Sequence, residues 1–412
     1  MLSRRMTFKT VLAATAAASL GTRAVRAEDR VVKVGVNLSF TGADAETAAR
    51  IGNGAIFAFE EANAAHVVPG FTFQLVKFDD ATATAGQYDP AQAATNARAM
   101  VSDKGFIAAL GPQMSGAGKA MAPILSQGDL AIITPASTNP DLTDPKFAAQ
   151  YRPGGKPVYF RTVTTDAYQG PNMANYFADV LKVKSIYVLD DSGAYGVGLA
   201  DAFQRQAEKK GIKVLGRDRL DPKAADYSAV LTKIKALNPD ALYYGGVAQA
   251  GVKLAKQAYD IIPSVIKAGG DGVQSADFLK GTGFPAVEGW YATVAAPHVT
   301  GDPKAASFSE RYFARFNTRP DDYTITIYTG AQVIIAAVKQ LVAEGKPVNR
   351  STVRDAIQSV TLPDSLLGPV AFDANGDLVN KVISIFKITK DASKPLDDPD
   401  AQYKYVGVAP MG

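Results

Sequence analysis

The stretch "ALGPQMSGAGKAMAPILSQGDLAIITPASTNP", residues 109–140, decides the fold. It begins at the end of one short apolar run and contains a second, 130–136, with a helical pattern at 117–127 between them. Short apolar strands on either side of a helix indicate a βαβ unit with parallel strands. Each run leads into small hydroxyl residues, Ser115 after the first and Thr138 after the second. The stretch has no Cys, no His and a single carboxylate, so it offers hydrogen-bond donors without a nucleophile or a base.

The same alternation extends along the chain in both directions. Apolar strands are expected at 31–38, 71–80, 105–111, 130–136, 159–163, 185–191, 212–220, 241–246, 264–270 and 289–296, with helical patterns between them. Segments 368–378 and 382–389 are predicted to close the chain as a hairpin around Asn375 and Gly376. Two successive runs of βαβ units predict an α/β protein of two doubly wound parallel-sheet lobes. Ligands of such sheets bind beyond the carboxyl ends of the strands, where the hydroxyl residues lie.

Residues 1–27 have the layout of a secretory signal, with basic residues, an apolar stretch at 10–20 and small residues before a cleavage site. The motif "SRRMTFK" also resembles a twin-arginine signal, so the Sec and twin-arginine routes both stay open. The leader holds five basic residues and no acid. Of 44 Lys and Arg, 39 therefore remain against 40 Asp and Glu, a net charge of −1. That balance gives no reason to expect binding to nucleic acid or to an anionic membrane surface.

Size and composition set further bounds on the chain. Without its leader the chain keeps 385 of its 412 residues, which is too many for one hydrophobic core and suits two domains. No segment after the leader is apolar over the ~20 residues that a membrane-spanning helix needs, so no direct membrane insertion is expected. Because the cysteine count is zero, disulfides and thiolate chemistry play no part.

Motifs for catalysis and for cofactors are missing from the sequence. The two histidines, His66 and His298, stand alone, and no serine has the G-x-S-x-G context. The Gly-Lys pair at 118–119 lacks the glycine that a phosphate-binding loop places before it. Acidic pairs such as Asp79-Asp80 have no histidine companions, so we expect no metal site and no cofactor. These gaps favour a binding protein over an enzyme.

A small zwitterion is a ligand that the strand-end residues suit. Each of its charges loses water in a cleft and must meet a partner, because a buried unpaired charge costs several kcal/mol. Ser115 and Thr138 are placed to meet a carboxylate, together with backbone amides at helix N-termini. Asp271, just after the strand at 264–270, is placed to meet an ammonium. The alternative interpretation is that Ser115 and Thr138 only cap the helices that follow them.

The chain after its leader resembles the leucine/isoleucine/valine-binding proteins, the extracytoplasmic receptors of ABC-type amino-acid importers with the type I periplasmic binding fold. The motifs that carry the resemblance are "LSFTGADAETAARIGNGAIFAFEEAN" (38–63), "GPQMS" (111–115), "ITPASTNPDLT" (133–143), "FRTVTTDAYQGPNMANY" (160–176), "YVLDDSGAYGVGLADAF" (187–203), "YYGGVAQAG" (243–251), "GGDGV" (269–273) and "GPVAFDANGD" (368–377). Their order and spacing are specific, although no single motif is decisive.

The resemblance implies a role for each matching residue. Ser115, Ala136 and Thr138 match positions that hold the α-carboxylate of the ligand, and Thr138 and the Ala136 carbonyl can also reach its amine. Asp271 matches an acidic position that pairs with the ammonium, followed by Gly272 as in the family.

Two tyrosines complete the implied site. Tyr195 matches an aromatic residue that closes over the ligand from the second lobe, and Tyr168, in the interlobe stretch, is a further candidate.

Three residues depart from the family pattern. Thr47 stands where branched-chain binders often have a bulky residue at the side-chain pocket, and Val247 stands where a tyrosine is common. Asp271 is one methylene shorter than the glutamate often found there. The half of the site that recognises the ligand backbone is kept while the side-chain half is altered. An amino acid is therefore expected, while leucine is not implied; some relatives bind amides, urea or aromatic acids.

The resemblance also implies organisation and partners. Lobe 1 is expected at 28–157 with 290–365, and lobe 2 at 158–289 with 366–412, so that three segments form the hinge. Lobe 1 binds the ligand first and lobe 2 then closes over it. The closed form, expected to be a periplasmic monomer, delivers the ligand to the permease subunits of an ABC transporter. A receptor for a solute without an α-amine and a ligand sensor of the same fold are the alternatives.

Overall fold

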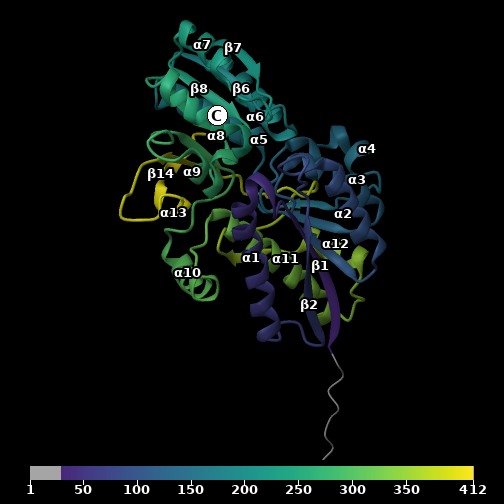
Figure 1. Cartoon of the computed structure of the whole chain (residues 1–412). Coiled ribbons are helices and arrows are strands. Elements are labelled where there is room, and N and C mark those ends of the chain that lie inside the picture. The colour runs from purple at the N-terminus through teal and green to yellow at the C-terminus, as the bar shows by residue number, and fades with distance from the viewer. Residues whose placement is uncertain (1–28, 412) are drawn as a thin grey trace, which may run out of the picture.

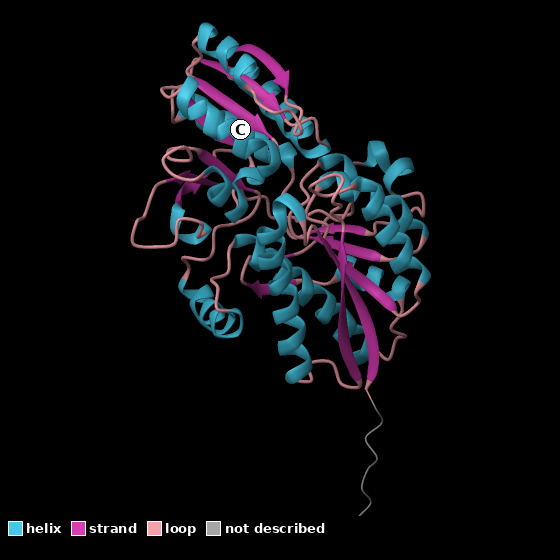
Figure 2. Ribbon diagram, in the orientation of Figure 1, coloured by secondary structure: helices cyan, strands magenta, loops and turns pink. Residues whose placement is uncertain are grey.

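The chain forms two α/β units, each built on its own sheet (Figure 1). The computed structural model describes residues 29–411, and the secretory signal predicted for 1–27 lies outside them. We call the unit on the five-stranded sheet lobe 1 and the unit on the seven-stranded sheet lobe 2. Helices pack against the sheets of both units (Figure 2). The predicted fold class, two doubly wound lobes with parallel sheets, is confirmed.

Lobe 1 has the strand order β2-β1-β3-β4-β5, with every pair parallel. The strands are β1 (Arg30–Leu38), β2 (Phe71–Asp79), β3 (Phe106–Leu110), β4 (Ala131–Thr134) and β5 (Tyr159–Arg161). The helices of this part are η1 (Gly42–Asp44), α1 (Ala45–Ala64), α2 (Pro90–Ser102), α3 (Ser115–Gln127), η2 (Pro140–Leu142), η3 (Pro145–Phe147), α4 (Ala148–Tyr151), α10 (Pro303–Phe316), α11 (Asp322–Ala343) and α12 (Arg350–Ser359). The strand order reverses between β1 and β3, which is where such sheets place a ligand.

Lobe 2 has the strand order β14-β13-β10-β9-β8-β6-β7. Its strands are β6 (Ser185–Asp190), β7 (Lys213–Arg219), β8 (Ala241–Gly245), β9 (Ile266–Gly269), β10 (Tyr291–Val294), β13 (Ser384–Ile388) and β14 (Tyr403–Val408), of which the last two run antiparallel. The helices are α5 (Asp166–Asp179), α6 (Ala194–Lys209), α7 (Ser228–Leu237), α8 (Ala248–Ile261), η4 (Asp271–Val273), α9 (Ala276–Thr282) and α13 (Pro399–Gln402). Here the strand order reverses between β6 and β8.

The crossings between the lobes differ from the predicted bounds by several residues. β5 belongs to the sheet of lobe 1 although the prediction starts lobe 2 at residue 158, and β10 belongs to lobe 2 although the prediction starts the second part of lobe 1 at residue 290. In each case an apolar strand ends just before the crossing, and the apolar pattern does not say which sheet it joins.

The three crossing segments meet at Thr164. Its amide donates to the Ala295 carbonyl at 2.6 Å, and its hydroxyl bonds the carbonyl and amide of Val382, each at 3.2 Å. One residue therefore links all three segments of the hinge.

The hairpin predicted for 368–378 and 382–389 is wrong. β13 pairs with β10 and β14 instead, and β12 (Gly368–Val370) pairs with β11 (Leu362–Ser365). The turn at Asn375 and Gly376 closes only an isolated bridge between Phe372 and Leu378. This turn packs on lobe 1, where the Gly376 carbonyl accepts a bond from the Arg161 amide. Packing against lobe 1 thus outweighs the local hairpin signal.

The longest helix forms the core of lobe 1. The expectation that no segment after the leader is apolar enough to span a membrane is wrong for α11, which is the one helix of the described residues with the required length and composition. Because 72% of its most apolar window is buried inside the protein, α11 is accounted for as a core helix. It packs on α1 with the helices in close contact at Gly54, where a Cβ atom would lie 2.5 Å from the Thr324 carbonyl oxygen. Burial of such apolar faces supplies about 25 cal/mol per Å² to the stability of the lobe.

Candidate functional site

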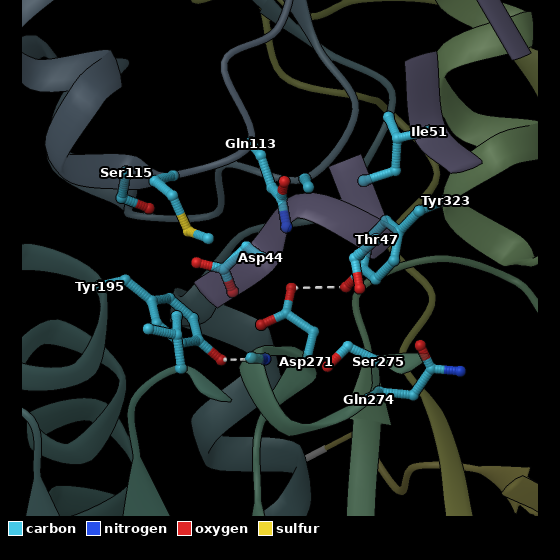
Figure 3. A pocket seen from close by; sticks show the side chains of 14 residues that line it. Asp44, Thr47, Ile51, Gln113, Ser115, Tyr195, Asp271, Gln274, Ser275 and Tyr323 are labelled. Atoms are coloured by element: carbon cyan, nitrogen blue, oxygen red, sulfur yellow. Dashed lines mark hydrogen bonds between the residues drawn. The ribbon is translucent and has the colours of Figure 1, made fainter. Parts of the chain in front are cut away.

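A cavity lies between the two lobes (Figure 3). Its space not filled by atoms, open solvent at the mouth included, is about 460 Å³. The lining residues come from both lobes and are Asp44, Thr47, Ile51, Gln113, Met114, Ser115, Ala136, Tyr195, Val247, Asp271, Gly272, Gln274, Ser275 and Tyr323.

Both points of strand reversal face this cavity. In lobe 1 the chain leaves β1 towards Asp44 and β3 towards Ser115, and in lobe 2 it leaves β6 towards Tyr195 and β8 towards Val247. Helices α1, α3, α6 and α8 begin at or next to these four residues. The positive ends of four helix dipoles therefore lie around the cavity, an arrangement that favours a bound anion.

Ser115 has a hydroxyl that is free to donate into the cavity. Its Oγ accepts a bond of 3.2 Å from the amide of Asn139, which leaves the hydroxyl hydrogen available. Ser115 is the first residue of α3 rather than its cap, and Asn139 caps η2 by accepting from the Asp141 amide. The alternative interpretation, that Ser115 and Thr138 serve only as helix caps, therefore does not describe this structure.

Asp271 places a carboxylate on the lobe 2 side of the cavity. It is 7% exposed, and its Oδ2 accepts a bond of 2.7 Å from the hydroxyl of Tyr323 in lobe 1. The hydroxyl of Tyr195 accepts a bond of 3.1 Å from the amide of Gly272 beside it (Figure 3). Burial raises the pKa of Asp271, and the tyrosine hydroxyls oppose this rise. A ligand cation at this position would favour the ionised carboxylate.

Asp166 lies buried behind Asp271. Its side chain is fully buried, and within residues 29–411 neither carboxyl oxygen has a hydrogen-bond partner. Burial, and then the charge of Asp271, raise its pKa well above the usual range. Burial therefore disfavours the charged form of Asp166, and Asp271 is the member of the pair that lines the cavity.

Asp44 is a second carboxyl group in the cavity wall, on the lobe 1 side. It is 4% exposed, and its Oδ2 has no hydrogen-bond partner in the described part of the chain. Burial, followed by the charges of Asp277, Asp80 and Asp191, raises the pKa of Asp44 to about 7. The cavity therefore holds two carboxyl groups, and none of its fourteen described lining residues is Lys, Arg or His.

Seven of the nine residues predicted for the site line the cavity. They are Thr47, Ser115, Ala136, Tyr195, Val247, Asp271 and Gly272. Thr47 also reaches across the lobes, where its amide and hydroxyl donate to Asp277 Oδ2 at 2.9 and 2.6 Å.

The structure does not bring Thr138 and Tyr168 to the cavity. Thr138 is fully buried, and its carbonyl accepts a bond from the Asp166 amide. Tyr168 lies on the outer surface of α5 with 39% exposure, and the Lys381 ammonium lies 5.7 Å from the centre of its ring. The motif placed both residues near the site, but the direction of a side chain depends on the backbone at the crossing.

The sequence interpretation missed seven of the lining residues. These are Asp44, Ile51, Gln113, Met114, Gln274, Ser275 and Tyr323. Asp44 and Gln113 follow β1 and β3, so the rule that ligands bind beyond strand ends could have found them. Tyr323 had no such signal, because it comes from a helix far along the chain that only the tertiary fold brings to the cavity.

Hydrogen bonds and an ion pair join the lobes around the cavity. Besides the bonds from Thr47 and Tyr323, the Asn139 side chain donates to the Ala194 carbonyl at 2.9 Å, and Lys280 lies 3.0 Å from Glu46. The two lobes are therefore in direct contact around the cavity.

Comparison with known proteins identifies the family of this chain. A family model described as "Periplasmic binding protein" matches residues 31–393. The Leu/Ile/Val-binding protein BraC3 of Rhizobium johnstonii is 29% identical over 382 residues, which cover 93% of this chain and 97% of that protein. This chain therefore belongs to the family of periplasmic binding proteins that includes the Leu/Ile/Val-binding proteins.

Solved structures agree on the fold. A leucine-binding protein from Thermotoga maritima superposes with a TM-score of 0.78 at 24% identity, covering 92% of this chain and 98% of that one. A solute-binding protein of an ABC transporter from R. palustris, solved in complex with benzoate, superposes with a TM-score of 0.74 at 18% identity, covering 92% and 96%. At these identities the likeness establishes the type I periplasmic binding fold alone.

Proposed function

We propose that this protein is the extracytoplasmic solute-binding component of an ABC-type amino-acid importer. It binds a small amino acid between its lobes and delivers it to the permease subunits of the transporter. The relative from R. johnstonii, which is named for binding Leu, Ile and Val, supports this proposal. In this function the protein is exported to the periplasm, acts as a monomer and changes no bond in its ligand.

One observation carries the proposal: the cavity presents a carboxylate from one lobe opposite a hydroxyl at a helix N-terminus from the other. Asp271 faces the cavity from lobe 2, and Ser115, at the start of α3, faces it from lobe 1. An α-ammonium pairs with the first group, and an α-carboxylate is held by the second together with the dipole of α3. Each lobe binds one charged group of the ligand, so the bound ligand holds the lobes together.

The hinge at Thr164 links ligand binding to a change in the shape of the protein. In this proposal the lobes close by a hinge motion in the three segments that Thr164 joins. A permease can then distinguish the loaded protein by its closed shape.

The second candidate is a receptor for a solute without an α-amine, such as an aromatic acid. The benzoate complex from R. palustris shows that this fold accommodates such a ligand. Calorimetric titration of amino acids against their deaminated analogues separates the two candidates. The first predicts that Asp271→Asn weakens binding of the amino acid by on the order of 100-fold or more, because the ammonium loses its counter-ion. Equal affinity for the deaminated analogue, or no effect of the substitution, would favour the second.

A ligand sensor of the same fold is a further alternative for the whole protein. It would use the same cavity, so it predicts the same titrations. Uptake of labelled ligand by cells with and without the gene decides between the two roles. Uptake is lost without the gene if the protein is a transport component and is unchanged if it is a sensor.

A further inference from the structure

The lining of the cavity holds one more carboxyl group than a neutral amino acid can pair with. Asp44 and Asp271 both point into the cavity (Figure 3), and no basic residue stands among the described lining residues. A neutral amino acid has one ammonium, which pairs with Asp271, and one carboxylate, which is held by Ser115 and the helix N-termini. Asp44, which is buried, is then left without a partner, at a cost of several kcal/mol if it is charged.

Asp44 does not serve the helix at whose N-terminus it stands. Aspartate is a preferred N-cap, because its carboxylate accepts from the first free amides of the helix. In the part of the chain that the structure describes, the side chains of Asp89, Asp144, Asp302, Asp321 and Asp398 all do this for their helices. The Asp44 side chain makes no such bond to α1 and is turned towards the cavity instead. Its Oδ2 is thus a buried acceptor without a local structural role.

A second acceptor lies in the same wall. Gln113 Oε1 has no hydrogen-bond partner in residues 29–411, and Figure 3 shows the Gln113 side chain pointing into the cavity on the lobe 1 side. A terminal ammonium carries three N–H donors, so the two acceptors together suit it. Asp44 and Gln113 therefore place two unpaired acceptors on one side of the cavity.

We propose that the ligand is a short diamino acid, whose side-chain ammonium is held by Asp44 with the carboxamide of Gln113. This inference rests on the proposed function and specifies the chemical class of its ligand. Asp271 then pairs with the α-ammonium and Asp44 with the distal one, so each buried carboxylate has a cation. The ligand carboxylate lies at the N-terminus of α3. Asp44 is accordingly the residue that sets specificity for a cationic side chain.

Matched pairs of ligands test the proposal in the full mature protein. Each pair differs by one terminal ammonium: 2-aminobutyrate and 2,4-diaminobutyrate, norvaline and ornithine, norleucine and lysine. By calorimetric titration at pH 7.5 we expect the diamino member of at least one pair to bind on the order of tenfold or more tighter than its neutral partner. Asp44→Asn should remove this preference, while Asp260→Asn, at an exposed position of α8, removes the same charge and should keep it.

The outcomes separate failure of this inference from failure of the proposed function. If neutral members bind as tightly as diamino members and Asp44→Asn changes neither, Asp44 is a protonated donor and the inference is overturned while amino-acid binding stands. If no amino acid of either kind binds, the proposed function fails as well. Should the Asp44→Asn protein fold poorly, the comparison of the three pairs on the wild type still decides, because a preference for the neutral members overturns the inference alone.

Discussion

Tyr323 of lobe 1 donates a hydrogen bond of 2.7 Å to Asp271 of lobe 2 across the cavity. Both side chains are buried, with 4% and 7% exposure, so the bond joins the lobes at a point shielded from water. The phenol both holds the lobes together and stabilises the charged form of Asp271. This one contact therefore couples the closure of the lobes to the charge of Asp271, which a ligand ammonium would meet.

Removal of the Tyr323 hydroxyl should weaken ligand binding. Tyr323→Phe deletes a hydrogen bond to a charged group, which is worth about 1.5–3 kcal/mol, so we expect affinity for the amino acid to fall by on the order of 10–100-fold. Calorimetric titration at pH 7 measures the change. Tyr328→Phe is the matched control, because that hydroxyl, on the same helix α11, bonds Glu61 outside the cavity. Equal losses in the two variants would show that the helix, rather than the contact with Asp271, is responsible.

Thr164 should set the stability of the hinge. Thr164→Val removes the hydroxyl that bonds the carbonyl and amide of Val382, which leaves partly buried backbone groups unpaired at a cost of about 1 kcal/mol. We expect a lower free energy of unfolding in urea, while Thr164→Ser, which keeps the hydroxyl, should stay near wild type. A Thr164→Val protein with unchanged stability would mean that water or the other crossing segments satisfy Val382.

The titration of Asp44 should make stability fall as pH rises. Its pKa is about 7 in the folded protein and ~3.9 in an unfolded chain, so between these values the folded state holds a proton that the unfolded state has released. Stability in the absence of ligand therefore decreases from about pH 4 to pH 7, by at most about 4 kcal/mol for this group.

The comparison with Asp44→Asn isolates this effect. Asp80 and Asp191, whose pKa values burial raises to about 6, titrate in both proteins, and Asp277 also faces Asp44 in both. Urea unfolding should show that the variant gains stability relative to the wild type between pH 5 and pH 8. A difference that does not change with pH would show that Asp44 is hydrated and titrates normally.

The parts of the fold that follow from local pattern could be predicted, and those that depend on tertiary contacts could not. The apolar strands with helices between them gave both sheets, and the strand-end rule led to Ser115 and Asp271, because these features are local in the sequence. The choice of sheet for β5 and the direction of the Tyr168 side chain depend on packing between distant segments. Asp44 could not be assigned to the site from its position alone, because an aspartate before a helix is commonly a cap and only the structure shows that its side chain makes no cap bond.

The turn that was predicted as part of a hairpin should be essential for the wall of the cavity. Asp377 in this turn lies 2.7 Å from the guanidinium of Arg161, which is fully buried at the end of β5. The same guanidinium donates to the carbonyls of Ser137 and Asn139, in the loop that follows Ala136 of the cavity. The ion pair therefore fastens this loop to the body of lobe 1.

Asp377→Asn should destabilise the protein by about 3–5 kcal/mol, because it leaves a buried guanidinium without a counter-ion. Asp364→Asn is the control, because Asp364 forms an exposed ion pair with Lys304. The two side chains are 90% and 76% exposed, respectively, so the loss of this pair should cost less than about 1 kcal/mol. Urea unfolding of both variants measures the two losses on the same lobe. Similar small losses would mean that the carbonyls around Arg161 suffice to hold its charge. A large loss for Asp377→Asn alone, accompanied by weaker ligand binding, would show that the turn supports the ligand site through Arg161.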